Sequence, residues 1–207
     1  MKVTIIGSGN VASVLGRKIL ASQHKIVEVN SRHYGNASLL ANELNAKAND
    51  NLKTIDRDSD IYMIAVNDNA VAEVADILKL DTGIVLHTSG SVSKNILQNS
   101  SHEYGVLYPL QSLRKEIIVN PFIPLLVDGN SFSVIEKIFS FAKTLSELTE
   151  EAGDEKRLQL HLSAVIVSNF SNHLYALAEV FCRKKNLDFS FLHPLIQETA
   201  TRMSNYS

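Results

Sequence analysis

The sequence predicts an α/β fold, in which a doubly wound, mostly parallel sheet is followed by a smaller all-helical domain. Three observations support this fold class. A short apolar run at residues 2–6 leads directly into the glycine turn at residues 7–9. Further apolar runs alternate with amphipathic segments up to about residue 150. Beyond that point, residues 158–178 contain no Asp, Glu, Lys or Arg, which is typical of a packed helix.

The elements expected in the sheet domain follow from apolar runs and helical spacing. Strands are expected over residues 2–6, 25–30, 60–66, 83–87, 105–108 and 122–127. Helices are expected over residues 10–22, 34–44, 70–78 and 131–145. Residues 45–53 are polar and could hold a short third strand, whereas Pro124 indicates that the strand over 122–127 lies at an edge of the sheet.

The sequence predicts a first domain over residues 1–150 and a helical domain over residues 151–207. The boundary is placed at the charged stretch 149–157. Residues 158–178 hold too many polar side chains for a membrane span, so we expect a helix buried in the helical domain or at a subunit interface. A second helix is expected over roughly residues 189–203.

Composition limits the function classes. The chain has 207 residues, 45% of them hydrophobic and 20% charged, and its net charge of −2 favours neither nucleic acid nor an anionic membrane as a partner. Cys182 is the single cysteine, so no intrachain disulfide forms. The first core strand begins at residue 2, which leaves no room for a signal peptide. These features favour a cytoplasmic protein.

The glycine turn resembles the dinucleotide-binding fingerprint of a Rossmann sheet. Gly7 permits a tight turn, Gly9 leaves space for backbone to approach a pyrophosphate, and Ala12 allows close packing of helix on sheet. The N–H groups at the start of the helix would then face the phosphates. The alternative is an ordinary strand–helix turn without a ligand. The cofactor contacts predicted here are Gly7, Ser8, Gly9, Asn10 and Val11.

The end of the second strand indicates which dinucleotide is bound. NAD-binding proteins usually place Asp or Glu there, but this chain has Asn30, Ser31 and Arg32. Ser31 can donate a hydrogen bond to a 2′-phosphate, and the Arg32 guanidinium can bind it with two N–H groups. The sequence therefore predicts NADP. The alternatives are a solvated loop arginine and an NAD- or flavin-linked dehydrogenase.

Two later strands also end in polar residues, at the edge where such sheets bind ligands. We expect Val66, Asn67 and Asp68 to contact the ribose or the nicotinamide, although Asp68 could instead cap the next helix. His87 is interpreted as a hydrogen-bonded strand-end residue rather than a proton donor. Ser89 is expected to contact both cofactor and substrate.

The long uncharged helix carries an arc of polar side chains that includes His161, Ser168, Asn169, Asn172 and His173. Such a cluster either joins helices or faces a polar ligand, because buried polar groups need partners. On the second interpretation Asn169 and His173 are catalytic, with His173 as the proton donor. The seven histidines show no spacing typical of a metal site.

Several motifs, taken in order, resemble one superfamily. It contains pyrroline-5-carboxylate reductase and the 6-phosphogluconate and 3-hydroxyisobutyrate dehydrogenases. More narrowly, the chain is similar to the Rossmann-like NADP oxidoreductases of the coenzyme-deazaflavin-dependent type, which carry a C-terminal helical domain of unknown function. The motifs are IIGSGNVA (5–12), NSR (30–32), IAVND (64–68), HTSGS (87–91), YPLQ (108–111), SNFSNHLYA (168–176) and PLIQETA (194–200).

The resemblance implies NADP(H) in the first domain, a homodimer formed through the C-terminal helices, and an active cleft between the domains. Two departures stand out. Tyr108 occupies a position where relatives commonly have histidine, and the chain stops at Ser207, whereas relatives continue through further helices. The helical domain is therefore expected to be incomplete.

The resulting hypothesis is an NADP(H)-dependent oxidoreductase that transfers a hydride to or from a small polar substrate or a deazaflavin. Ser89, Asn169 and His173 are its predicted catalytic residues. The alternative is a catalytically silent, dimeric NADP-binding sensor or scaffold. No nucleic-acid or membrane partner is expected in either case.

Overall fold

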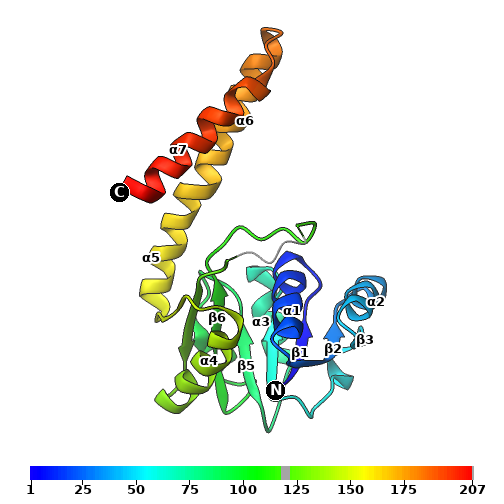
Figure 1. Ribbon diagram of the computed structural model, residues 1–207. Helices are drawn as coiled ribbons and strands as arrows, with labels where there is room; N and C mark the ends of the chain where they lie inside the picture. Colours follow the sequence, from blue (N-terminus) through cyan, green and yellow to red (C-terminus); the bar gives the residue numbers. More distant parts are fainter. Residues whose placement is uncertain (118–121, 207) are drawn as a thin grey trace. The chain divides into compact units, whose positions relative to one another are not determined.

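The computed structural model describes residues 1–117 and 122–206 of the chain (Figure 1). It divides into two compact units, residues 1–161 and residues 162–207. The first is an α/β unit and the second is helical, which confirms the predicted fold class.

The α/β unit is built on one eight-stranded sheet with the order β3-β2-β1-β4-β5-β6-β7-β8. Strands β6 and β7 are antiparallel, and the other neighbouring pairs are parallel. The strands are β1 (Lys2–Ile6), β2 (Lys25–Asn30), β3 (Lys47–Asn49), β4 (Ile61–Ile64), β5 (Ile84–His87), β6 (Glu103–Pro109), β7 (Leu125–Gly129) and β8 (Thr149–Glu151).

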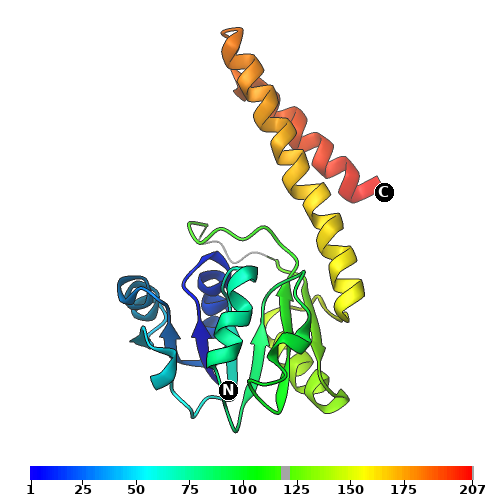
Figure 2. The same ribbon diagram turned by 180° about the vertical axis from the view of Figure 1, so that it is seen from behind.

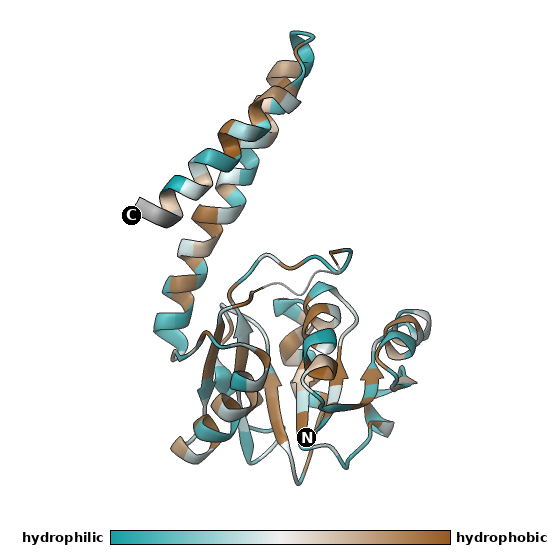
Figure 3. Ribbon diagram, viewed as in Figure 1, coloured by the Kyte–Doolittle hydropathy of each residue, from teal (hydrophilic) through white to brown (hydrophobic). Residues whose placement is uncertain are grey.

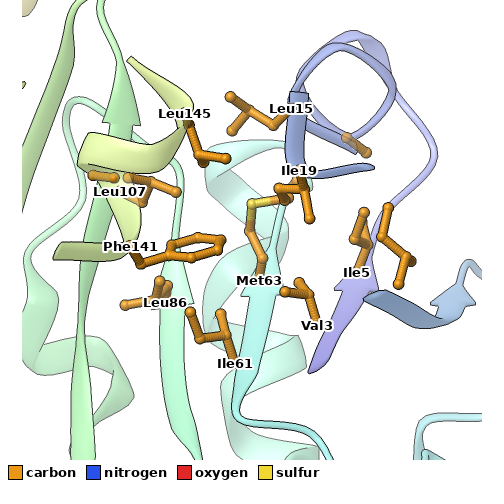
Figure 4. Packing of buried hydrophobic residues seen from close by; sticks show 14 of the residues in the cluster. Val3, Ile5, Leu15, Ile19, Ile61, Met63, Leu86, Leu107, Phe141 and Leu145 are labelled. Atoms are coloured by element: carbon orange, nitrogen blue, oxygen red, sulfur yellow. The ribbon is translucent and has the colours of Figure 1, made fainter. Parts of the chain in front are cut away.

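Helices cover both faces of this sheet (Figures 1 and 2). α1 (Asn10–Ala21), α2 (Tyr34–Glu43) and α4 (Phe132–Leu145) contribute to one apolar cluster, and α3 (Asp68–Ile77) contributes to another. In Figure 4, side chains of α1 and α4 meet those of the strands, with Phe141 and Ile19 close to Met63. Short helical turns η1 (Leu52–Thr54) and η2 (Lys94–Leu97) complete the connections.

The far edge of the sheet corrects one expectation. The strand expected at 122–127 was placed at an edge because of Pro124, but β7 begins after that proline and pairs with β6 on one side and β8 on the other. The edge strand is β8, which lies in the charged stretch expected to be a boundary. Its three residues contain no apolar run, so the sequence pattern gave no sign of it.

Parallel pairing brings the carboxyl ends of β1, β4, β5 and β6 to one edge of the sheet. The turn after β1 depends on glycine. Gly7 has a φ of +128°, and a Cβ there would lie 2.1 Å from the carbonyl oxygen of Ala65 at the end of β4. The two strands can therefore end side by side only if residue 7 lacks a side chain.

A buried ionic network fixes the start of α5 (Asp154–Ala164) on the α/β unit. The Arg157 side chain is 1% exposed; its guanidinium donates to the Val92 carbonyl at 2.6 Å and to Asp154 Oδ1 at 2.7 Å. Asp128, on β7, lies 3.9 Å from Arg157 Nη1 and accepts from Lys94 Nζ at 2.7 Å. Residues 154–161 are thereby held against β7 and η2.

His87 ends β5 and is fully buried. Its Nδ1 accepts a hydrogen bond from the Ser89 N–H at 3.2 Å. Burial, together with the positive charge of Arg157, lowers the pKa of His87 to about 4. The imidazole is therefore neutral near pH 7, in keeping with its interpretation as a strand-end residue rather than a proton donor.

The helical unit continues from α5 through a π-helical segment, η3 (Val165–Phe170), into α6 (Ser171–Lys184). A short turn, η4 (Phe189–Leu192), leads to α7 (His193–Tyr206), which runs back beside α6. Apolar and polar segments alternate along these helices (Figure 3). Among the described helices, none has both the length and the apolar character that a membrane crossing needs.

The apolar side of the long helix is exposed in the single chain, although the sequence predicted that it is buried. Val167 is 74% and Leu174 is 63% exposed. Phe170, Leu177 and Phe181 are exposed as well. Burial inside the helical unit is therefore wrong as an interpretation, and burial at a subunit interface stays a prediction.

The buried His87 makes stability depend on pH. Its pKa is about 4 in the folded chain and about 6.5 when unfolded, so between these values only the unfolded chain binds the proton. This contribution to the free energy of unfolding is complete above about pH 6.5, and we expect about 3 kcal/mol to be lost as the pH falls toward 4. Urea unfolding at several pH values measures this, and His87→Gln should flatten the dependence, whereas the exposed control His102→Gln should not. An equal slope in both variants would contradict the assignment.

Candidate cofactor site

The α/β unit contains a cleft of about 710 Å³ at the carboxyl edge of the sheet, here called the edge cleft. Its walls come from the turn after β1, the loop after β2, the segment after β3, the end of β4 and one side of α3. All of its lining residues belong to the first unit. Its size is in the range of small-molecule and cofactor sites.

The glycine turn forms one wall of the edge cleft. Gly9 is the N-cap of α1, and among the described residues no heavy atom lies within 4 Å of where a Cβ would stand. Asn10 turns its side-chain oxygen to the N–H of Lys115, at 3.3 Å. The first helical N–H groups have no acceptor within the helix, so this wall suits an anionic group such as a pyrophosphate. Ser8 and Val11 also line the cleft.

The loop after β2 forms the donor-rich end of the edge cleft. Ser31, Arg32 and Lys53 line it, and the Ser31 hydroxyl lies 2.8 Å from that of Ser8. Asn30 also lines the cleft, and among residues 1–117 and 122–206 its buried Nδ2 has no hydrogen-bond partner. Such a donor favours an acceptor from a ligand. Asp50 is an acid at this end, but β2 itself ends without a carboxylate, as the sequence indicated.

An apolar wall completes the edge cleft. Leu52 of η1 and Val74 and Ile77 of α3 line the edge cleft. A flat aromatic ring such as an adenine can pack against side chains of this kind while its phosphates reach the glycine turn. The residues present therefore fit a dinucleotide.

The structure places only some of the predicted contacts after β4 and β5 in the edge cleft. Val66 and Asn67 line the edge cleft, whereas its described lining does not include Asp68 or Ser89. Asn67, not Asp68, is the N-cap of α3, and Asp68 Oδ2 accepts a hydrogen bond from the Ser91 hydroxyl at 2.6 Å. The capping role considered for Asp68 is therefore wrong, because the carboxylate binds the loop after β5 instead.

Ser89 is buried at the start of that loop. Its Oγ accepts hydrogen bonds from the N–H groups of Ser91 and Val92, both at 3.2 Å. This arrangement leaves its hydroxyl proton as a donor. Among the described residues, no group of His, Cys, Asp and Glu side chains is placed to hold a metal ion.

A second polar contact lies beside this loop. Tyr108, near the end of β6, has its hydroxyl 2.8 Å from Nδ1 of His161 on α5. We refer to it as the Tyr108–His161 pair. Sequence reasoning noted both residues separately but did not join them, because they are 53 positions apart. The only available signal was that Tyr108 follows an apolar strand at the same edge as Ser89.

The remaining predicted residues lie in the helical unit. Asn169 belongs to the π-helical segment η3 and His173 to α6, and both are exposed. π-helical turns are rare and frequently occur at functional sites. The catalytic roles of Asn169 and His173 stay predictions.

Two family models match the chain. Residues 2–89 match the NADP oxidoreductase, coenzyme F420-dependent, model, and residues 123–207 match a domain of unknown function, DUF2520. Among curated proteins, none matches this chain.

Solved structures match over the whole chain. A protein of Bacteroides fragilis, provisionally described as an NADP oxidoreductase, is 33% identical with a TM-score of 0.92, over 100% of this chain and 81% of that one. Two others share the fold. A reductive aminase from Aspergillus terreus in complex with NADPH and ethyl-5-oxohexanoate is 16% identical, with a TM-score of 0.71, over 99% of this chain and 74% of that one. The 1-pyrroline-5-carboxylate reductase of Streptococcus pyogenes is 13% identical, with a TM-score of 0.70, over 100% of this chain and 81% of that one.

The resemblance inferred from the motifs is thus confirmed by a relative that is one-third identical along the full chain. The protein belongs to the NADP oxidoreductase family, with an N-terminal domain of the coenzyme F420-dependent type and a C-terminal DUF2520 domain.

Proposed function

We propose that the protein is an NADP(H)-dependent oxidoreductase that transfers a hydride to or from a small polar carbonyl or imine, or a deazaflavin. The observation that carries this proposal is the edge cleft, where an open helix N-terminus faces a donor-rich loop formed by Ser31 and Arg32. This cleft lies in a chain that belongs to the NADP oxidoreductase family.

The residues of the edge cleft account for cofactor binding. The turn at Gly7 and Gly9 would hold the pyrophosphate, Ser31 and Arg32 the 2′-phosphate, and Val66 and Asn67 the sugar next to the nicotinamide. When bound, NADPH supplies a hydride, and the protein contributes binding, orientation and electrostatics. Asp68 and Ser89 lie beyond the described cleft lining, Asp68 at the start of α3 and Ser89 in the loop after β5.

The proposed substrate classes are supported by the descriptions of the matching family and of one neighbouring structure. The matching family model is described as coenzyme F420-dependent, which suggests a deazaflavin acceptor. The reductive aminase complex contains a keto ester, which suggests a carbonyl or imine instead. Ser89, Asn169 and His173 are the proposed substrate contacts, with His173 as the sequence-based candidate for the proton donor.

A second function, silent NADP binding in a sensor or scaffold, is favoured by one observation. The described lining of the edge cleft includes none of Ser89, Asn169 and His173. A ligand can therefore occupy the edge cleft without contacting any of these proposed catalytic residues. Consumption of NADPH by an acceptor separates the two functions.

We also infer that the protein is a homodimer. The exposed apolar side chains of the helical unit, Val167, Phe170, Leu174, Leu177 and Phe181, form the surface that a second copy would cover. Large exposed apolar surfaces of this kind are typical of interaction sites.

The single cysteine is relevant to the cellular compartment in which the protein would work. Cys182 is buried and has no disulfide. A chain without a disulfide framework fits a reducing compartment, and we propose the cytoplasm.

The first prediction concerns cofactor choice. Arg32→Ala should weaken NADPH binding by about 1.5–3 kcal/mol and NADH binding little, because the lost charge-assisted contact is made only to the 2′-phosphate. Titration of cofactor emission measures both affinities. Arg57→Ala, at the amino edge of the sheet, is the matched control. Equal weakening of the two cofactors would rule out this role for Arg32.

The second prediction separates enzyme from silent binder. The chain contains no tryptophan, so NADPH emission can be followed without energy transfer from that residue. Binding should be followed by NADPH consumption with at least one of a panel of imines, 2-oxo acids, aldehydes and oxidised deazaflavin. If His173 is the donor, His173→Asn keeps NADPH affinity and slows turnover by about 10²–10⁴. Tight binding without consumption by any acceptor would favour the silent binder.

The third prediction concerns assembly. Sedimentation should show a dimer at micromolar concentration, and Leu174→Glu should shift it to monomer, because the charge would be buried in the interface. Leu39→Glu on α2 is the control, since Leu39 is equally apolar and 74% exposed on the other unit. A folded wild-type monomer would contradict the dimer.

A further inference from the structure

The Tyr108–His161 pair lies level with Ser89 at the carboxyl edge of the sheet. His87 of β5 pairs in register with Val106 of β6. Tyr108 lies two residues further along β6, and Ser89 lies two residues beyond the end of β5. The pair therefore stands beside the loop that follows β5, at the edge where doubly wound sheets bind their ligands.

The loop after β5 packs directly on the pair. A Cβ at Gly90 would lie 2.7 Å from His161 Nδ1 and 2.8 Å from Tyr108 Cζ, so a side chain at this position would displace both rings. The two rings meet edge to face, with centroids 5.7 Å apart. A glycine is thus needed for the backbone to approach the hydrogen bond between them.

His161 reaches this place because α5 is anchored one turn earlier. Arg157 is fixed by Asp154, the Val92 carbonyl and Asp128. His161 follows it by four residues and lies on the same side of the helix. The ring is partly exposed, while Tyr108 is 9% exposed. The pair therefore joins a buried hydroxyl to an imidazole that can exchange protons with water.

The edge cleft leaves this part of the sheet free for the rest of a dinucleotide. Most of its described lining comes from the segments after β1, β2, β3 and β4 and from α3, with Leu113 after β6, and this suits the adenosine and pyrophosphate. The next strand ends, β5 and β6, carry Ser89 and Tyr108. We propose that Tyr108 is the catalytic proton donor of the reaction and that His161 is the positioning residue that returns its proton. This inference rests on the proposed function.

Reduction of a C=O or C=N bond requires one hydride and one proton. The carbon gains the hydride that NADPH supplies, and its heteroatom gains the proton as the O–H bond of Tyr108 breaks. The Tyr108 oxygen then takes the proton from Nδ1 of His161. His161 regains a proton from water. The products are the alcohol or amine and NADP⁺.

The surroundings of Tyr108 keep its hydroxyl protonated but make the proton harder to release. Burial, and next the negative charge of Asp68, raise the pKa of Tyr108, so its hydroxyl stays protonated before the reaction. A neutral phenol is a weak acid by itself, and the adjacent His161 supplies the replacement proton. Histidine is the side chain that commonly exchanges protons near neutral pH.

The first test asks whether the nicotinamide binds beside the Tyr108–His161 pair, and it does not require turnover. In ¹⁵N-histidine-labelled protein, Tyr108→Phe should shift the ring nitrogens of His161, because Nδ1 loses its hydrogen bond. NADP⁺ should shift the same signals, whereas 2′-phospho-ADP-ribose, which lacks the nicotinamide, should not. His161→Asn assigns the signals and His102 is the internal control. Unchanged His161 signals with NADP⁺, or equal shifts with both ligands, would overturn the placement.

The second test measures the chemistry with an acceptor that consumes NADPH. Tyr108→Phe should lower kcat by about 10²–10⁴ while NADPH affinity is kept. His161→Asn should also lower kcat, and the double variant should be no slower than Tyr108→Phe, because the two residues act as a unit. Tyr104→Phe, at the other end of β6, and His102→Asn should leave kcat unchanged.

The outcomes distinguish this inference from the proposed function. Absence of NADPH binding, or binding without consumption of any acceptor, contradicts the proposed function, and the donor role falls with it. Turnover that survives Tyr108→Phe overturns the inference alone. So does additive loss in the double variant, or a loss of kcat confined to His173→Asn.

Discussion

Parallel pairing of β1, β4, β5 and β6 is the constraint on which the rest of the structure depends. It brings four strand ends to one edge, so residues from distant parts of the chain meet there. The pairing of β1 with β4 requires Gly7, because the Ala65 carbonyl occupies the space of a side chain. The same glycine turn opens α1 toward the edge cleft. Fold and cofactor site therefore depend on one backbone approach.

Buried polar groups near this edge of the sheet hold α5 in place against it. Arg157, Asp128 and Lys94 form a network whose members would be costly to bury singly, since a buried charge needs a compensating partner. The network holds the start of α5 against the sheet, and His161 therefore lies within hydrogen-bond distance of Tyr108. His87 is neutral in the same region because burial disfavours its charged form. It supports the strand end without carrying charge.

The two units carry different candidate functional features. The α/β unit contains the whole described lining of the edge cleft, whose residues fit the proposed dinucleotide. The helical unit contributes an exposed apolar surface and a π-helical segment that contains Asn169. The edge cleft is the basis for the proposed cofactor binding, and the exposed apolar surface is the basis for the proposed dimer.

The sequence by itself determined the strands with continuous apolar runs, the glycine turn, and the acid-free end of β2 with Ser31 and Arg32. These depend on neighbouring residues, so local pattern contains them. The position of β8, the antiparallel pairing of β7 and the exposure of Leu174 were decided by tertiary structure. The Tyr108–His161 pair belongs to the same class. Its two residues are 53 positions apart, and only strand register and the anchoring of α5 bring them within a hydrogen bond.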